Sequence, residues 1–350
     1  MYQEISQLLM YGDIDENEIL YEMGQLFARF EKGGYEKMEL VRDINTQVKR
    51  ILKIATDYGF DDNLWHNYLT FYLMMNENPF SITCEKVGAS EGSVNGLVQQ
   101  DFALFKKLFD YDFSRIEEAL EISCFSSISN YKAIVKKDLM YNKNVSEKVR
   151  TLSKKLEETK SARDFFQVMS DFYRDYGVGM FGMNKAFRIE EKPEGGIVFK
   201  PINNMDAVVL DDLIGYEIQK KKLVDNTQAF VDGKKANNAL LFGDSGTGKS
   251  TSIKAIVNQY YDDGLRMIEI YKHQFKYLST VISEIKNRNY KFIIYMDDLS
   301  FEEFEIEYKY LKAVIEGGLE KKPNNILIYA TSNRRHLVRE TFKDKSDRDE

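Results

Sequence analysis

The sequence has few of the residues that cross-links and metal sites require. Its 350 residues include only two cysteines, Cys84 and Cys124, which are far apart and outside any Cys-x-x-Cys pair. We therefore expect reduced, buried thiols rather than a disulfide or a metal site. The three histidines, His66, His273 and His336, are scattered along the chain, which argues against a zinc site.

Long apolar runs and an excess of basic residues are also missing. No apolar run approaches the ~20 residues that are needed to cross a bilayer, and residues 1–4 do not begin a signal peptide. We expect a soluble, cytoplasmic protein that does not contact membranes. The net charge of −7 argues against a general nucleic-acid coat, because phosphate binding needs clustered cations, although a local basic patch is compatible with it.

Proline is scarce as well, with four residues, which favours long helices. Hydrophobic residues make up 43% of the chain and include 23 Phe and 22 Tyr, a composition that forms packed cores. A chain of this length accommodates two domains of about 100–200 residues each. Apolar residues recur at spacings of three and four over 16–31 and 38–57. We predict a mostly α-helical domain over 1–180, with its aromatic stripes in the core.

The pattern changes after this helical half. Two short strands with a turn between them are predicted within 181–205, and we interpret this hairpin as a hinge with the domain boundary near position 200. A second domain is predicted over 206–338. The polar tail over 339–350 is expected to be disordered.

Strands and helices alternate in the second domain. Each predicted strand is a short apolar run, and an amphipathic helix follows it. This alternation implies an α/β fold with a parallel sheet and helices on both faces, in which ligands bind at the carboxyl ends of the strands. The predicted strands cover 239–242, 266–271, 291–296 and 325–330.

The most specific motif follows the first of these strands. Gly243 to Ser250 fits G-x-x-x-x-G-K-[ST], the phosphate-binding P-loop or Walker A motif, whose glycines let phosphate oxygens approach the backbone N–H groups. Lys249 would bind the β- and γ-phosphates, and the Ser250 hydroxyl would ligate Mg²⁺. A glycine-rich turn without a ligand is the alternative. The predicted nucleotide-binding residues of the loop are Gly243, Asp244, Ser245, Gly246, Thr247, Gly248, Lys249, Ser250 and Thr251.

Two acidic residues follow the third predicted strand. The apolar run 292–296 leads into Asp297 and Asp298, a pattern that resembles a Walker B motif. Asp297 would hold the Mg²⁺ shell together with Ser250, and Asp298 would orient and deprotonate the attacking water. The alternative is that Asp298 is only an acidic residue at a helix N-terminus, where the macrodipole favours it.

The fourth predicted strand ends in polar residues. Asn333 is the first choice for a contact with the γ-phosphate or the attacking water, and Thr331 is the second. Lys249, Asp298 and Asn333 are thus the predicted catalytic residues. The basic triplet over 334–336 either meets phosphate, another subunit or nucleic acid, or consists of solvated loop charges.

The order of strands, helices and motifs resembles that of the AAA+ ATPases. The segment Leu213 to Glu217 looks like the stretch that packs beside adenine in that superfamily, so the resemblance implies that Ile214 and Gly215 contact the base. The end of the fourth strand, Thr331 to Arg334, resembles the sensor 1 region of the same proteins. The resemblance implies a Mg-ATP ligand.

One bacterial family of AAA+-type ATP-binding proteins is more similar still. The stretches 297–302, 311–320 and 329–337 resemble the family known as domain of unknown function 815, and 78–113 resembles its Gram-positive members. AAA+ proteins usually carry Glu where this chain has Asp298. The shorter side chain withdraws the carboxylate by about 1.5 Å, and a shift of that order can slow a reaction ~10²-fold. We therefore expect slow turnover.

A second departure concerns the end of the chain. AAA+ proteins usually continue through a fifth strand and a helical lid that carries the arginine finger and the sensor 2 arginine. We expect that lid to be absent here, either because the chain is truncated or because these parts come from elsewhere. An arginine finger of this kind raises the rate of hydrolysis by about 10³–10⁵-fold.

The pattern as a whole predicts a slow AAA+-type ATPase that couples nucleotide state to a protein partner through its helical first half. One alternative is an ATP-dependent switch or scaffold with negligible hydrolysis, and another is a DNA-linked ATPase like the helicase loaders. A small-molecule kinase is less favoured, because neither an acceptor-site motif nor an Arg-rich lid is found. Homo-oligomers are expected by analogy alone. Tyr271 and Phe275 are candidate pore-loop residues, but ordinary packing is the favoured interpretation.

Overall fold

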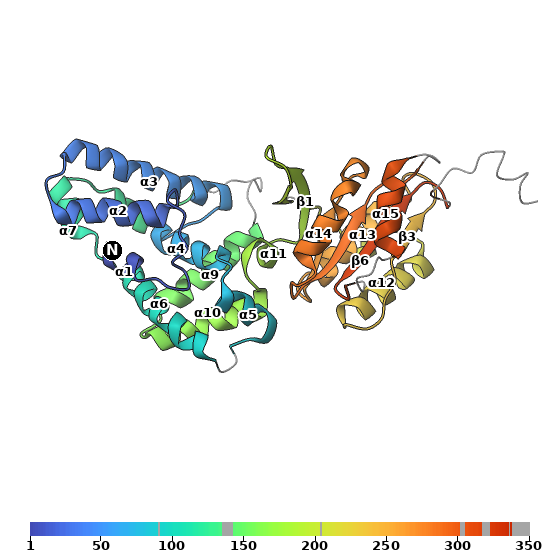
Figure 1. Cartoon of the computed structure of the whole chain (residues 1–350), viewed down its shortest axis with the longest axis horizontal. Coiled ribbons are helices and arrows are strands. Elements are labelled where there is room, and N and C mark those ends of the chain that lie inside the picture. The colour runs from blue at the N-terminus through green and yellow to red at the C-terminus, as the bar shows by residue number, and fades with distance from the viewer. Residues whose placement is uncertain are drawn as a thin grey trace, which may run out of the picture. The chain divides into compact units, whose positions relative to one another are not determined.

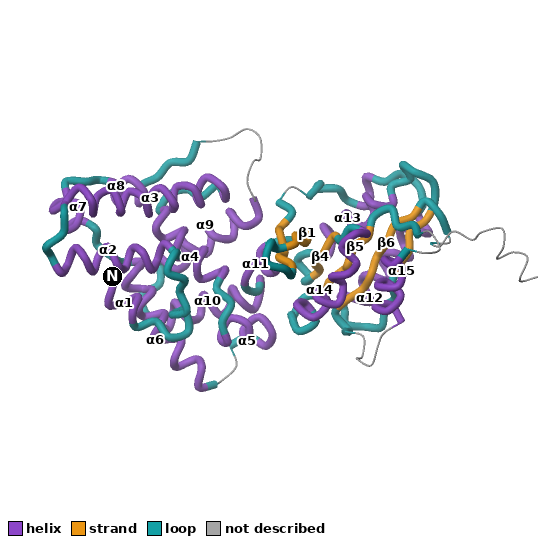
Figure 2. Tube along the Cα trace, turned by 45° about the horizontal axis from the view of Figure 1, so that its top comes forward, coloured by secondary structure: helices purple, strands orange, loops and turns teal. Residues whose placement is uncertain are grey.

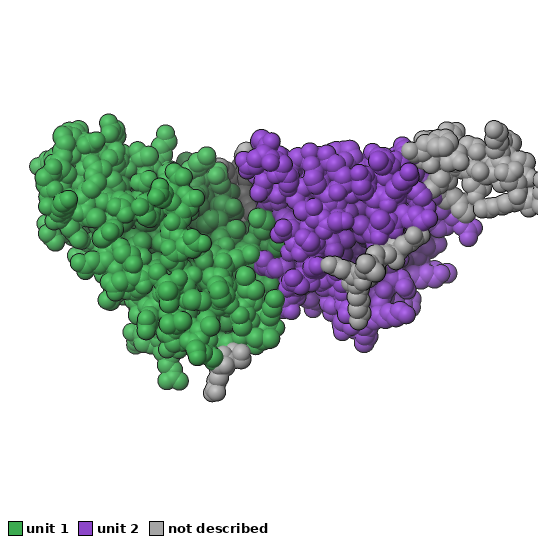
Figure 3. Space-filling model, viewed as in Figure 1, with its two compact units in different colours: residues 1–183 green, residues 184–350 purple. Residues whose placement is uncertain are grey.

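Two compact units make up the chain, Met1–Met183 and Asn184–Glu350 (Figure 3). No helix within the described part of the chain is long and apolar enough to cross a membrane. The computed structural model describes residues 1–89, 92–134, 143–203, 205–301, 305–316, 323–335 and 337.

The first unit is built from helices, which confirms the helical region predicted over 1–180 (Figure 1). Cys84 is buried in this unit, Cys124 is half-buried, and both are free thiols. The helices are α1 Tyr2–Ser6, α2 Ile19–Lys32, α3 Lys37–Tyr58, α4 Leu64–Met75, α5 Pro79–Val87, α6 Ser93–Phe109, α7 Ser114–Leu120, α8 Cys124–Ser129, α9 Lys143–Glu157, α10 Ala162–Tyr176 and α11 Gly179–Met183.

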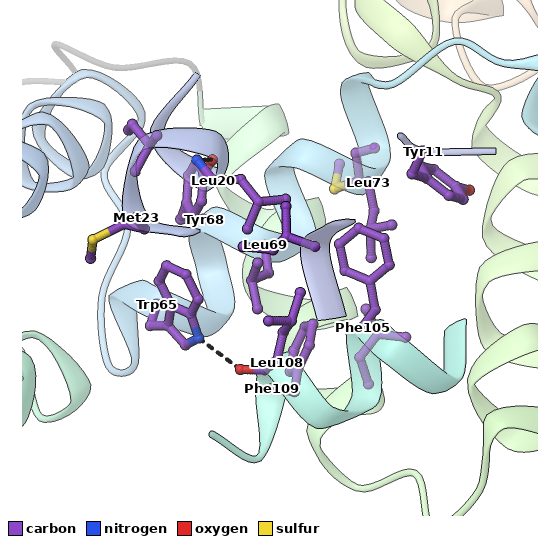
Figure 4. Close-up of a cluster of buried hydrophobic side chains, with 14 of the residues drawn as sticks. Tyr11, Leu20, Met23, Trp65, Tyr68, Leu69, Leu73, Phe105, Leu108 and Phe109 are labelled. Atoms are coloured by element: carbon purple, nitrogen blue, oxygen red, sulfur yellow. Dashed lines mark hydrogen bonds between the residues drawn. The ribbon is translucent and has the colours of Figure 1, made fainter. Parts of the chain in front are cut away.

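Helix α4 lies within the core of this unit, as the close-up of the buried cluster shows (Figure 4). Most of its side chains are buried, so it has no polar face and other helices must surround it. Its polar atoms are paired inside the core: the Trp65 indole donates to the Leu108 carbonyl at 2.8 Å, and the Tyr68 hydroxyl donates to Glu18 at 2.8 Å. The aromatic stripes predicted from the sequence therefore form this core.

A buried carboxylate attaches the N-terminal segment to α6. Asp101 is only 1% exposed, and it accepts hydrogen bonds from the backbone N–H groups of Leu9, Met10 and Tyr11 at 2.8–3.1 Å. A buried charge is tolerated when donors surround it in this way.

The second unit contains a six-stranded sheet in the order β2-β1-β4-β5-β6-β3. Strands β1 and β2 pair antiparallel, and every other neighbouring pair is parallel, so the predicted parallel sheet is confirmed with one antiparallel edge. The strands are β1 Ala186–Glu191, β2 Ile197–Pro201, β3 Ala239–Phe242, β4 Leu265–Glu269, β5 Lys291–Met296 and β6 Ile326–Ser332.

The hairpin that we interpreted as a hinge over 181–205 is part of this sheet. Strand β1 pairs in parallel with β4, and Phe187 lies opposite Ile268. The two units divide at Met183, before the expected boundary near 200. A hairpin is visible in the local pattern, but its pairing with a strand far along the chain is not.

Helices cover both faces of the sheet (Figure 2). Helices α12 and α13 bury one face, because Leu223, Phe230 and Ile256 cluster there with Met267 and Ile293 from the strands. The crossovers through α14 and α15 run across the sheet in the opposite direction to the crossover through α13, so right-handed connections place them on the other face. The helices are α12 Glu217–Val231, α13 Lys249–Tyr260, α14 Leu278–Ile285 and α15 Ile306–Glu316, with short 3₁₀ turns at Leu210–Asp212 and Lys272–Tyr277.

Within the described ranges no helical lid follows β6, and the predicted polar tail over 339–350 lies outside those ranges.

We predict that Asp101→Asn destabilises the first unit by about 3 kcal/mol, because an amide presents its own N–H to backbone donors and loses the charge that they stabilise. Urea unfolding followed by the fluorescence of Trp65, the single tryptophan of the sequence, reports on this unit. Asp110→Asn is the control, since that side chain is 59% exposed at the end of the same helix and should change stability by less than about 0.5 kcal/mol. Equal effects of the two substitutions would contradict the role of Asp101.

Candidate functional site

The candidate site lies where three neighbouring strands reach their carboxyl ends. Strand β6 lies between β3 and β5 in the sheet. The P-loop follows β3, the two aspartates follow β5, and Asn333 follows β6. Segments that are far apart in the sequence therefore meet at one edge of the sheet, where parallel α/β sheets bind their ligands.

The P-loop has the backbone conformation that its glycines permit. The φ angles of Gly243, Gly246 and Gly248 are 145°, 77° and 81°, in the region that favours glycine. Helix α13 begins at Lys249 directly after Gly248. The backbone N–H groups of the glycine loop thus lead directly into the N-terminus of a 12-residue helix, an arrangement that attracts anions.

The Lys249 amine is folded back over this loop. It donates to the carbonyl oxygens of Gly243 at 2.8 Å and Asp244 at 2.6 Å. It also lies 3.3 Å from the Asn333 side-chain oxygen. This contact connects the P-loop to the end of β6 and brings two of the predicted catalytic residues together.

A hydrogen-bond network joins the first turn of α13 to the ends of β5 and β6. The Ser250 hydroxyl donates to Asp297 Oδ1 at 2.8 Å, and the Thr331 hydroxyl donates to the same oxygen at 2.5 Å. Thr331 Oγ1 in turn accepts from the backbone N–H of Asp298 at 2.9 Å. Thr331 is 1% exposed, so its hydroxyl holds the carboxylate from within the sheet.

This network sets the charge of Asp297. Partial burial raises the pKa of the carboxyl, but the nearby hydroxyls of Thr331, Tyr295 and Ser250 lower it by more, so the net pKa lies below its usual value of 3.8. Its stabilising contribution is therefore present at pH values above the unfolded-state pKa and is lost as the pH falls through the lower folded-state pKa. Asp297 is an anion at neutral pH.

Asp298 lies beside it with an unusual backbone. Its φ is 47°, in the left-handed region that few non-glycine residues adopt. The side chain is exposed, and Asn333 Nδ2 donates to its Oδ1 at 3.0 Å. Helix α15 begins only at Ile306, so this helix does not account for Asp298 as an N-terminal acid. Two of the predicted catalytic side chains are therefore in direct contact.

The segment predicted to adjoin adenine lies against the P-loop. A Cβ atom on Gly248 would come within 2.9 Å of a Leu213 methyl group, and Lys220 donates to the Leu213 carbonyl at 2.8 Å. Ile214 follows and is 97% exposed, and Gly215 has a φ of 85°. An apolar side chain is thus presented to solvent next to the loop.

Sequence reasoning missed one polar group of the site, Tyr295. It precedes Asp297 by two residues, so strand alternation directs both side chains to one face, a signal that was available in the sequence. Tyr295 is 1% exposed, and burial raises the pKa of its hydroxyl well above the usual value.

Other candidates lie apart from this network. Phe275 is 1% exposed and packs in the unit, whereas Tyr271 is 41% exposed and donates to Glu269 at 3.3 Å. Arg334 and Arg335 are exposed, and His336 lies outside the described residues.

The side chains at the site fit a Mg²⁺ ion. Ser250 offers a hydroxyl oxygen and Asp297 an ionised carboxylate, and the two oxygens are 2.8 Å apart. Hard oxygen ligands of this kind are those that Mg²⁺ takes, commonly together with substrate phosphates.

Comparison with known proteins finds a family model and several solved structures that are similar to part of this chain. Residues 182–350, a little under half of the chain, match the model of the family described as "Protein of unknown function (DUF815)", so the second unit is similar to that family. No curated protein matches the chain. Among solved structures, C. elegans PCH-2 is similar with 18% identity and a TM-score of 0.30, over 40% of this chain and 43% of that one.

Two further structures show similar values. A point mutant of Thermotoga maritima RuvB is 17% identical with a TM-score of 0.28, over 37% of this chain and 43% of that one. DnaI is 21% identical with a TM-score of 0.29, over 41% of this chain and 80% of that one. The chain thus spans less than half the length of the PCH-2 and RuvB chains that it matches.

The second unit has an AAA+-like P-loop NTPase fold, as its motifs led us to expect. The mostly parallel sheet carries a P-loop after an edge strand, with helices on both faces. A fold of this kind binds nucleotides in general.

We predict that Gly248→Ala destabilises the second unit more than Gly246→Ala does. Both residues have positive φ angles, which cost about 1–2 kcal/mol for alanine. Only at Gly248 would the added methyl group meet another side chain, that of Leu213. Thermal unfolding followed by circular dichroism should show an additional loss of about 1–2 kcal/mol. Combining Gly248→Ala with Leu213→Ala should remove that difference, and equal losses for the two single variants would contradict the contact.

Proposed function

We propose that this protein binds Mg-ATP through its second unit and hydrolyses it slowly. The observation that carries the proposal is the continuous set of contacts from the P-loop lysine through Asn333 to Asp298, next to the pair formed by Ser250 and Asp297. One network thus contains a candidate residue for binding phosphate, for binding the metal and for acting as the base. Phosphoryl transfer needs these groups close together, because positioning and charge stabilisation supply nearly all of the catalysis.

Each residue has a separate part in this proposal. The glycines and backbone N–H groups of Gly243 to Thr251 hold the phosphates, and Lys249 exchanges its loop carbonyls for β- and γ-phosphate oxygens. Ser250 and Asp297 hold the Mg²⁺ ion. When bound, that ion neutralises charge on the phosphate oxygens.

The base proposed here is Asp298, held in place by Asn333. Its exposed carboxylate accepts a hydrogen bond from the Asn333 amide, which leaves its remaining lone pairs free to orient a water and take its proton. Asn333 also contacts Lys249, so it can align the lysine that binds the γ-phosphate with the base. Ile214 and Gly215 are proposed to contact the adenine.

A binding switch with negligible hydrolysis is the second candidate. The side chain of Asp298 is one methylene shorter than the Glu of related ATPases, and its left-handed backbone fixes the direction in which it leaves the chain. If the carboxylate falls about 1 Å short of the water, turnover drops by about 10² while binding persists. Measuring ATP turnover of the purified protein separates the two candidates.

The wider role is also a proposal. We infer that the helical first unit contacts a protein partner and that the protein acts in the cytoplasm. Assembly into homo-oligomers is a further possibility that we propose to test. Binding to nucleic acid is less favoured given the net charge of −7. Sizing with and without ATP tests assembly, and DNA affinity measured across salt concentrations tests the helicase-loader alternative.

We predict that Lys249→Ala weakens binding of a fluorescent ATP analogue by about 10–100-fold, because charge-assisted hydrogen bonds to phosphate contribute about 1.5–3 kcal/mol. Lys254→Ala is the control, since that lysine lies on the same helix and pairs with Asp206 at 3.2 Å instead. Unchanged affinity in Lys249→Ala would refute the P-loop assignment.

We predict that Asp298→Asn lowers kcat by about 10²–10⁴, the usual contribution of a general base, while affinity for ATP stays within about twofold. Turnover is measured by phosphate release at saturating Mg-ATP. Asp263→Asn, which changes an exposed acid in the turn after α13, should leave both values unchanged. If Asp298→Asn turned over ATP at the wild-type rate, the base would have to be another group.

A further inference from the structure

A buried hydroxyl at the site lacks a hydrogen-bond partner in the described part of the chain. Tyr295 Oη is fully buried and makes no hydrogen bond to any residue that the structure describes. A buried hydroxyl without a partner costs about 1–3 kcal/mol, and buried tyrosine hydroxyls usually find one. Such a group needs an explanation that packing alone does not supply.

The surroundings of this hydroxyl identify its target. Its ring packs in the apolar cluster beneath α13, together with Ile253 and Ile256. The polar side chains that act on the hydroxyl are those of Ser250, Asp297 and Thr331. The phenol therefore lies close to the proposed Mg²⁺ ligands Ser250 and Asp297.

The donors of Asp297 leave room for a further hydrogen bond. Both the Ser250 and the Thr331 hydroxyls donate to Oδ1 of the carboxylate. A carboxylate accepts about four hydrogen bonds, and a tyrosine hydroxyl is a donor at neutral pH.

We propose that Tyr295 is a positioning residue for the Mg²⁺ site, whose buried hydroxyl donates to the Asp297 carboxylate and fixes the orientation in which it meets the metal. The inference rests on the proposed function. This hydrogen bond is not made among the described residues and would form when the carboxylate binds the metal beside Ser250. Outer groups of this kind typically change metal affinity by about 10–100-fold when they are removed.

The neighbouring strand provides a matched control. Tyr329 lies directly opposite Tyr295 in the pairing of β5 with β6, and it is equally buried. Its hydroxyl is already satisfied, at 2.8 Å from the Thr227 hydroxyl and 3.0 Å from the Asn226 amide. Removing either hydroxyl thus deletes the same atom from the same layer of the core, but only one of them faces the metal ligands.

The test compares Tyr295→Phe with Tyr329→Phe in the full chain. Binding of a fluorescent ATP analogue is measured in EDTA and in a Mg²⁺ titration. The contributions of the nucleotide and of the metal to affinity are then measured separately, and ATP turnover is not needed. For Tyr295→Phe we expect unchanged affinity in EDTA and an about 10-fold higher Mg²⁺ concentration for half-maximal effect. In EDTA its Tm should equal or exceed that of the wild type, because the hydroxyl that is removed has no hydrogen-bond partner in the structure without the metal.

For Tyr329→Phe we expect the reverse pattern, with a lower Tm and a wild-type Mg²⁺ requirement. The inference is overturned if Tyr295→Phe keeps the wild-type Mg²⁺ requirement, or if it loses affinity equally in EDTA. Failure of the wild-type protein to bind the analogue under either condition would instead refute the proposed function, and this inference with it. The two failures are therefore distinguishable.

Discussion

The candidate site depends on the hydrogen bonding of a single carboxylate. Asp297 Oδ1 accepts from Ser250, on the helix that follows the P-loop, and from Thr331, near the end of β6. Three segments that are far apart in the sequence are thereby joined at one atom. The hydroxyls around the carboxylate outweigh the effect of burial and lower the pKa of Asp297, so the group that joins these segments is also an anion.

This arrangement is possible because of the strand order. With β6 between β3 and β5, Leu241 lies opposite Thr331, and Met296 lies opposite Ala330. Residues after the ends of these strands must then meet at one edge. Thr331, buried in the central strand, supports Asp297 from within the sheet and holds the backbone of Asp298 in its left-handed turn. The sheet positions the acidic pair, and Ser250 and Lys249 connect the glycine loop to it through Asp297 and Asn333.

Several features were predictable from local patterns. The P-loop, the apolar run before Asp297 and the helical first half are visible because their physics is local, namely glycine spacing and the periodicity of buried side chains. The hairpin near 190 is recognisable too, but its role is not. The local pattern suggests a hinge, whereas β1 adds to the sheet beside β4. Pairing depends on backbone groups brought together by the whole fold, and these leave no local pattern.

By itself, therefore, the sequence determined that this chain has a helical half followed by an α/β half with a phosphate loop and an acidic pair. Only the tertiary structure decided which side chains touch: that Asn333 joins Lys249 to Asp298, that Thr331 lies under Asp297, and that Tyr295 is left without a partner among the described residues. The physical reason is the distance along the chain over which each kind of interaction acts. Propensity and periodicity act within a few residues, whereas hydrogen bonds of 2.5–3.3 Å between strand ends exist only after the sheet has set its order and register.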